Sequence, residues 1–322
     1  MNIYEQINKN KRSTRLFLLI FSLLFLLIGL GADHYYGTGA QMPVFTLGAL
    51  GGSIAVSFSG YFYGDRLILN SAHAHELDFS DLKQKQWQNI IEEMSIASGI
   101  PVPKTYLVDD ADPNAFATGR NPQHASLAVT RGLLEVLSRE ELQAVAAHEM
   151  SHIRNYDVRL MLIVAVLAGS VALLADWARR MTFRGGQKRG NSNGKSNGPA
   201  AVIFLAVWIV SLILAPLVSR LVAMCVSRRR EYLADASGAE LTRNPLALAK
   251  ALEKISACAG PTESIHQGSA HLCIADPLGS ALNNSEGWFS ELFGTHPPIG
   301  QRIARLKEMS YISQPQSGIR LA

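Results

Sequence analysis

The chain has 322 residues, of which 48% are hydrophobic and only 17% are charged, and its mean hydropathy is +0.11. Because soluble domains carry about 25% charged residues, this composition argues against a wholly soluble protein and predicts that part of the chain lies in lipid. The net charge of +4 is small and we find no nucleic-acid-binding motif, so we expect no nucleic-acid partner. The three cysteines form no paired metal-binding spacing, and their odd number argues against a disulfide framework.

Four apolar runs account for the high hydropathy: Leu16 to Ala32, Val44 to Gly64, Leu160 to Ala175 and Ala201 to Ser219. A membrane-crossing helix needs about 20 apolar residues, with about 17 as the lower limit. The second and fourth runs satisfy this, the first is at the limit and the third is short. We therefore predict four transmembrane helices. The alternatives are a buried helical hairpin for the third and fourth runs, and a cleaved signal peptide for the first.

The basic residues beside these runs predict the orientation, because cytoplasmic flanks are enriched in Lys and Arg. The segment before the first run is basic, whereas residues 33–43 contain neither Lys nor Arg. We therefore expect the amino terminus and residues 65–159 in the cytoplasm. The Gly/Ser/Asn-rich residues 181–199 should lie outside, yet they are basic. Either the third and fourth runs form a shallow hairpin or the earlier signals dominate, and both leave the active domain cytoplasmic.

The polar stretches on either side of the third and fourth runs predict helices and a small sheet. In the first stretch we expect a helix over Leu82–Ser98 and strands over Thr105–Val108, Ala115–Thr118 and Ser126–Thr130. A further helix runs from Arg139 to about Asp157. In the second stretch we expect helices at Arg228–Leu241, Pro245–Ala257 and Ile299–Met309, with residues 260–295 as loop. We assign no function to His73 and His75, which lie in a predicted loop.

The predicted helix after Arg139 carries the motif H-E-x-x-H, formed by His148, Glu149 and His152. Residues four apart lie on one face of a helix, so both histidines can bind one metal ion. Glu149 is then placed to polarise a water on that metal. Ser138 and Glu141 form a capping box that predicts where this helix begins. The alternative is a surface helix with two solvated histidines.

A catalytic zinc site usually has three protein ligands and one open position, so the third ligand has to be found elsewhere. Asn155 and Val158 stand where the metzincin pattern needs glycine and histidine, and that pattern therefore fails. Glu231 and Asp235 share one face of the predicted helix after the fourth run. We predict that Glu231 binds the metal. Asp235 is predicted to accept a hydrogen bond from a ligand histidine, with His148 as the first choice.

These residues and the apolar runs resemble the HtpX-type membrane metalloproteases, which are relatives of the CAAX prenyl protease among the gluzincins. Three further pieces of the sequence match this family. They are the segment from Asp112 to Gly119, the residues Asn155 and Asp157 after the histidine motif, and the segment from Thr295 to Pro298 with Arg302. The matched order runs from the first apolar run to about Leu306. Tyr156 departs from the expectation of a small residue at its position.

The resemblance implies a zinc endopeptidase, with one Zn²⁺ per chain, at the cytoplasmic face of a bacterial inner membrane. We expect it to cross the membrane several times, with the lipid bilayer as a partner. Its expected substrates are misfolded or damaged membrane proteins, which it would cleave in stress response and quality control. Self-cleavage is left open. By resemblance, His296 and Arg302 supply a donor to the oxyanion, so that Glu149, His296 and Arg302 are the expected catalytic residues. We expect the substrate backbone to be held as an added strand by Asn114, Ala115, Phe116 and Ala117. The alternatives are that Asn114 only forms a turn, that His296 only precedes a helix, and that Arg302 is a solvated helix charge.

The expected fold is a mainly α membrane protein with four transmembrane helices and a gluzincin-like α+β metalloprotease domain with a small sheet. Residues 1–71 hold two membrane helices and 72–158 the first half of the metalloprotease domain. Residues 159–227 hold two further membrane helices, and 228–322 hold the second half with the third ligand. Two other functions stay open: a non-proteolytic membrane adaptor with a structural zinc site, and a prenyl-protein protease, which the four predicted spans fit less well.

Overall fold

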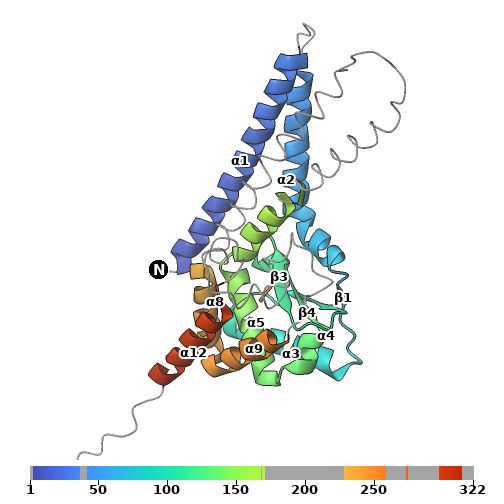
Figure 1. The fold of residues 1–322 in the computed structure, drawn as a ribbon. Helices are drawn as coiled ribbons and strands as arrows, with labels where there is room; N and C mark the ends of the chain where they lie inside the picture. The colour runs from blue at the N-terminus through green and yellow to red at the C-terminus, as the bar shows by residue number, and fades with distance from the viewer. Residues whose placement is uncertain are drawn as a thin grey trace, which may run out of the picture.

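The computed structural model describes residues 3–36, 42–167, 169–170, 228–258, 273–274 and 297–313. The described part is mainly helical and contains one small mixed sheet. Two long helices, α1 (Ile3–Tyr36) and α2 (Val44–Ser71), run side by side away from the rest of the protein (Figure 1). The sheet and the shorter helices pack together at the opposite end, where the amino terminus also lies.

The outer surfaces of α1 and α2 are apolar. Leu19, Leu23, Ile54 and Phe58 are each more than half exposed, which a water-facing helix pair would not tolerate as a continuous surface. Among the described residues, α2 is the one helix long and apolar enough to cross a membrane. The first predicted run lies within α1. Four transmembrane helices are therefore not established: the third run is described only to residue 170, and the fourth lies outside the described residues.

The sheet has the strand order β1-β2-β4-β3, in which β2 and β4 are parallel and the other neighbours antiparallel. Its strands are β1 (His75–Glu76), β2 (Lys104–Val108), β3 (Ala115–Gly119) and β4 (Ala125–Thr130). The last three confirm the predicted strands to within one residue. The prediction that His75 lies in a loop is wrong, because His75 pairs with Leu107 of β2. A strand of two residues is too short to show an alternating pattern.

The helices around the sheet begin and end where their capping residues predict. Helix α3 (Leu82–Ser98) has Asp81 as N-cap, and Gly99 ends it in the left-handed conformation with φ of 69°. Helix α5 (Arg139–Arg154) begins with the predicted capping box of Ser138 and Glu141. It ends three residues earlier than predicted, because Tyr156 adopts a left-handed φ of 61° that a helix cannot continue through.

The remaining described elements complete the helical layer. The short helix α4 (Arg131–Val136) and the 3-10 turn η1 (Pro122–His124) were not predicted. Helices α8 (Arg228–Thr242) and α9 (Pro245–Ala257) match the predicted helices closely, and α12 (Ile299–Ser313) begins as predicted and extends four residues further. Residues 157–167 are also helical and follow α5 after a turn.

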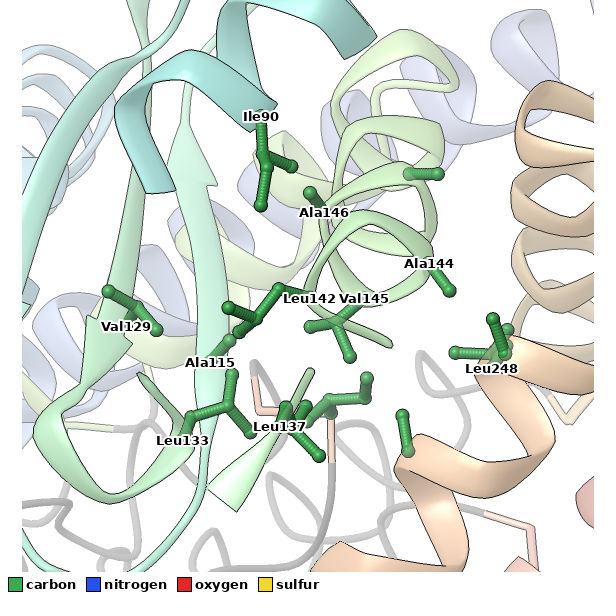
Figure 2. Packing of buried hydrophobic residues seen from close by; sticks show 14 of the residues in the cluster. Ile90, Ala115, Val129, Leu133, Leu137, Leu142, Ala144, Val145, Ala146 and Leu248 are labelled. Carbon is green, nitrogen blue, oxygen red and sulfur yellow. The ribbon is translucent and has the colours of Figure 1, made fainter. Parts of the chain in front are cut away.

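One hydrophobic core joins the two polar stretches of the chain. Figure 2 shows Leu142 and Val145 of α5 between Ala115 and Leu133 on one side and Leu248 of α9 on the other. Full burial of a side chain such as leucine contributes about 1.5–3 kcal/mol. Because α5 contributes to the core on several faces, it is held rigidly against the sheet, α8 and α9. That rigidity fixes the position of the residues near its carboxyl end.

Candidate active site

Helix α5 carries both histidines of the H-E-x-x-H motif on one buried face. The Nε2 atoms of His148 and His152 lie 3.3 Å apart, and the two rings are nearly perpendicular, with centroids 4.8 Å apart. Both side chains are buried, so the alternative of two solvated histidines is wrong. Glu149, the residue between them in the motif, is buried as well.

Helix α8 brings Glu231 to the same place. Its Oε2 lies 3.8 Å from Nε2 of His148, and its Oε1 lies 3.5 Å from Nε2 of His152. This approach depends on Gly238, also on α8: a Cβ there would lie 3.0 Å from the backbone nitrogen of His148. The small residue lets α8 lie against α5 closely enough for Glu231 to reach both imidazoles.

The three side chains have the spacing that a tetrahedral metal ion requires. Ligand atoms that each lie about 2.0–2.1 Å from a tetrahedral zinc are about 3.3–3.4 Å from one another. The observed separations of 3.3, 3.5 and 3.8 Å are close to that value. Within the described residues, His148, His152 and Glu231 form a group of buried ligands whose atoms all lie within 4.8 Å of one another. Two imidazoles and one carboxylate are a donor set found in catalytic zinc sites.

Asp235 orients the first histidine. Its Oδ1 lies 3.0 Å from Nδ1 of His148, the nitrogen that faces away from the proposed metal position. The aspartate is held in turn by Arg302 of α12, which donates to Oδ2 from Nε at 2.9 Å and to Oδ1 from Nη2 at 2.7 Å. Arg302 also donates from Nη1 to the carbonyl oxygen of Ile274 at 2.9 Å. With an exposed fraction of 0%, Arg302 is not the solvated helix charge that was one alternative.

Asp157 orients the second histidine. Its Oδ2 lies 3.0 Å from Nδ1 of His152, so each histidine of the motif has its own buried carboxylate. Sequence reasoning matched Asp157 to a family motif but gave it no role. The signal that could have found it is a carboxylate just beyond the helix, five residues after a metal-binding histidine, because such histidines usually donate their second nitrogen to a carboxylate.

Burial and charge shift the acidities of these groups. Burial raises the pKa of Glu149 to about 8. Burial alone would lower the pKa of His152, but the hydrogen bond to Asp157 and the charge of Glu231 outweigh it and raise the value to about 9. Burial also lowers the pKa of His148, although Asp235 opposes this. The net shift of the pKa therefore follows the acidic neighbours only at His152, whereas burial has the largest effect and sets the direction at Glu149 and His148.

The charges of the cluster favour a divalent cation. Four carboxylates are buried there, from Glu149, Asp157, Glu231 and Asp235. Two buried guanidinium groups, those of Arg230 and Arg302, lie among them. Buried charges are costly unless they are paired, and a divalent metal ion that replaces the protons on Glu149 and His152 would pair with the carboxylates of the cluster. The residues present therefore fit a metal by their spacing and by the chemistry of their donor atoms.

Strand β3, predicted to hold the substrate, lies at one side of the sheet next to Glu149. The backbone N–H of Ala117 donates to the Glu149 carboxylate. Nearer the start of the strand, Phe116 forms a β-bridge with Cys273, and the N–H of Ile274 donates to the carbonyl oxygen of Ala115 at 3.0 Å. The outward backbone edge at Ala115 and Phe116 is thus already paired within the chain, and the part next to the site begins at Ala117.

Of the other two predicted site residues, the structure describes Asn114 but not His296. Asn114 is buried before β3, where its Oδ1 accepts a hydrogen bond from the N–H of Ala115 at 3.0 Å. Its backbone oxygen accepts from the N–H of Thr130 at 3.0 Å. These contacts fix the start of the strand. His296 lies outside the described residues, which resume at Pro297.

Comparison with known proteins points to one family of metalloproteases. The sequence profile of peptidase family M48 matches residues 81–310. A protease HtpX homolog of Streptococcus uberis is 39% identical over 307 residues, which cover 95% of this chain and all of the relative. A protease HtpX homolog of Thermoanaerobacter pseudethanolicus is 40% identical over 308 residues, 96% of this chain and 98% of the relative. The crystal structure of Ste24p from S. mikatae has a TM-score of 0.51 at 17% identity, covering 94% of this chain and 67% of that one; at this identity the likeness concerns the fold alone.

Proposed function

The chain belongs to peptidase family M48 and is a membrane metalloprotease related to the HtpX proteases, and from this premise we propose that it is a zinc-dependent endopeptidase. Its substrates are misfolded or damaged membrane proteins, which it cleaves at the cytoplasmic face of a bacterial inner membrane. The observation that carries the proposal is the spacing of three buried ligand atoms, from His148, His152 and Glu231, beside the carboxylate of Glu149.

The chemistry follows from what each side chain can do. Zinc at this site would act as a Lewis acid and make a water molecule more acidic. Glu149 accepts the proton of the attacking water and then returns it to the leaving amine. Asp157 and Asp235 keep the proton of each imidazole on Nδ1, so that both Nε2 atoms face the metal.

Arg302 and His296, which the resemblance predicts as donors to the oxyanion, are assigned different roles. We assign Arg302 a positioning role in place of direct contact with the oxyanion, because its shortest hydrogen bonds go to Asp235 and to the carbonyl oxygen of Ile274, with Nη2 also 3.4 Å from Nε2 of His148. His296 remains our proposed donor to the oxyanion. The proposal for His296 rests on the family motif before α12.

The substrate backbone is proposed to lie along β3 from Ala117 onward, next to Glu149. Main-chain pairing of this kind recognises the backbone more than the side chains, which suits an enzyme that degrades many unfolded proteins. In this proposal Asn114 supports the strand from within through its bond to Ala115. Ala115 and Phe116 belong to the same strand, but their outer edge is occupied by residues 273 and 274.

The membrane location is supported by the apolar outer surfaces of α1 and α2. The basic residues before the first apolar run support a cytoplasmic amino terminus. That terminus lies at the same end of the molecule as the catalytic cluster (Figure 1), and α1 contacts the cluster directly through Asn10. We therefore propose that the active site faces the cytoplasm and that the protein is multi-pass.

The test compares substrates and metal states of the full-length protein in mild detergent. We expect cleavage of an unfolded membrane protein, loss of cleavage after zinc is removed by a chelator, and recovery when zinc is added back. Cleavage of a prenylated peptide in preference to the unfolded protein would favour the prenyl-protease alternative. Tight zinc binding without cleavage of either substrate would favour the adaptor alternative and overturn the proposal.

A further inference from the structure

The first three turns of α1 carry a buried polar face. Gln6, Asn10 and Thr14 are spaced four residues apart, so they lie on one side of the helix, and their exposed fractions are 3%, 2% and 3%. A buried polar side chain without a partner is costly. Gln6 donates to Oδ1 of Asn10 and Thr14 to its backbone oxygen, so it is the Asn10 amide that meets polar groups of the domain. Residues 16–32 of α1, which follow, are mainly apolar, so this polar face lies at the end of the helix that touches the domain.

Asn10 uses its carboxamide group on the turn that follows α5. Its Nδ2 donates to Oδ1 of Asp157 at 2.5 Å and to the backbone oxygen of Asn155 at 3.0 Å. The other carboxylate oxygen of Asp157, Oδ2, lies 3.0 Å from Nδ1 of His152. A continuous series of hydrogen bonds thus runs from the first helix of the chain to a proposed metal ligand.

A second contact of α1 lies on the same turn. Tyr156, between the two residues that Asn10 contacts, has a left-handed φ of 61°, which is unfavourable for a residue with a side chain. The ammonium group of Lys11 lies 4.4 Å from the centre of its ring, and the guanidinium group of Arg159 lies 5.1 Å from it. Cation–π contacts of this kind are attractive. Helix α1 therefore holds a strained turn from two adjacent positions, 10 and 11.

We propose that Asn10 is a positioning residue of the active site: it fixes the carboxylate of Asp157, which holds the imidazole of His152 with Nε2 toward the metal. Helix α1 is then a structural part of the metal site as well as a membrane anchor. The inference rests on the proposed zinc site, and it concerns a residue 138 positions before the first histidine of the motif. Without Asn10, the carboxylate can turn away from Nδ1 and His152 loses its fixed orientation.

The experiment measures zinc affinity by competition with a chelator, on the full-length protein in detergent. Loss of a group that orients a ligand histidine typically lowers metal affinity by about 10–100-fold. We expect about tenfold weaker binding for Asn10→Leu, which has a similar volume and no donor. The matched control is Thr14→Val, on the same face one turn later, because among the described residues the Thr14 hydroxyl donates to the backbone oxygen of Asn10 in its own helix and to no group of the domain. The control should bind zinc as the wild type does.

A double-mutant cycle separates positioning from general loss of structure. If Asn10 acts through Asp157, Asn10→Leu should weaken zinc binding in the wild-type background and have no further effect in an Asp157→Ala background. Equal zinc affinity of Asn10→Leu and Thr14→Val, or losses that multiply in the double variant, would overturn the inference. If Asn10→Leu does not fold, Asn10→Ala gives the same comparison with less steric change.

Failure of the inference about Asn10 can be distinguished from failure of the proposed function. If the wild type binds zinc and cleaves substrate while Asn10→Leu matches the control, the proposed function stands and the role of Asn10 is lost. If the wild type binds zinc but cleaves nothing, the proposed function fails, yet the affinities still decide whether Asn10 positions the site. In an active enzyme we also expect Asn10→Leu at saturating zinc to lower kcat and leave KM unchanged, because Asn10 does not touch the substrate.

Discussion

Arg302 and Asp235 form a two-pronged ion pair in the interior of the protein, with nitrogen–oxygen distances of 2.9 and 2.7 Å. The pair joins α12 to α8, and Asp235 in turn lies 3.0 Å from Nδ1 of His148. Charge-assisted pairs of this geometry are strong and directional. The last described helix of the chain is therefore connected to the first histidine of the H-E-x-x-H motif by an arginine that is completely buried.

Removing this arginine should destabilise the protein strongly. Breaking a buried ion pair by removing one partner costs about 3–5 kcal/mol, because the other charge stays buried without its partner. We expect Arg302→Met to lower the free energy of unfolding of the metal-free protein by about that amount, measured by denaturation in detergent. Arg305→Met, at an exposed position on the same helix, should cost less than about 1 kcal/mol. Equal effects of both variants would show that the pair contributes little.

The third ligand can be tested by its metal content. We expect Glu231→Gln to lose most of its bound zinc, since a neutral amide replaces the only carboxylate among the three described ligands. Glu240→Gln is the matched control, because it lies at the exposed end of the same helix, α8. Metal analysis of both purified proteins is the measurement. Retention of one zinc per chain by Glu231→Gln would exclude Glu231 as a ligand.

Because α8 and α5 lie close together at Gly238, a single methyl group added there should weaken zinc binding. In Gly238→Ala the new Cβ would lie 3.0 Å from the backbone nitrogen and 3.2 Å from the Cα of His148. Since backbone atoms cannot turn aside, α8 has to shift and carry Glu231 away from the imidazoles. We expect weaker zinc binding in a chelator competition. Gly300→Ala should bind zinc normally, because nothing lies within 4 Å of its Cβ; weakening of both to the same degree would contradict this explanation.

The capping box of α5 predicts a pH-dependent contribution to stability. Burial raises the pKa of Glu141, but hydrogen bonds from Lys254 and from the backbone of Ser138 outweigh burial and hold the pKa below its ordinary value. A carboxyl group with a lowered pKa in the folded state stabilises that state above the pKa of the unfolded chain. The contribution is lost as the pH falls through the folded pKa.

We therefore expect Glu141→Gln to lower stability at pH 7 by about 1 kcal/mol, the usual effect of losing a cap. The difference from wild type should shrink as the pH falls below the ordinary pKa of the unfolded chain, and disappear below the lowered pKa of the folded state, where the carboxyl group is protonated in both states. The measurement is the midpoint of thermal unfolding of the metal-free protein across this pH range. Glu140→Gln, exposed in the same turn, should change stability by only a few tenths of a kcal/mol. A destabilisation of Glu141→Gln that does not vary with pH would contradict the assignment.

Local spacing explains which parts could be predicted from the sequence. The spacing of His148 and His152 on one helix requires them to share a face, and the capping box of Ser138 and Glu141 fixes the start of α5 to the residue. The three predicted strands could be recognised for the same reason, because each is long enough to show its pattern. Glu231 could be named because it forms, with Asp235, a carboxylate pair at helical spacing after the fourth apolar run, in a chain that already carried the H-E-x-x-H motif.

Long-range contacts explain what could not be predicted. Asn10 and Asp157 meet across 147 residues, and neither residue carries a local signal for the other. The bridge between Phe116 and Cys273 depends on a single residue pair, which leaves no periodic pattern in the sequence. The buried position of Arg302 depends on Asp235 and the carbonyl of Ile274, whereas its own helix has the charge pattern of an exposed surface. Such contacts are decided by packing of the whole domain.

The central claim is that Glu149 is the base of a zinc endopeptidase, and the most direct measurement compares the wild type with Glu149→Gln at matched zinc content. Both proteins are loaded with zinc in mild detergent, and cleavage of an unfolded membrane protein is followed. The account predicts that both bind one zinc and only the wild type cleaves. Cleavage by Glu149→Gln at the wild-type rate would contradict the assigned base. Absence of cleavage by a zinc-loaded wild type would contradict the proposed activity on this substrate.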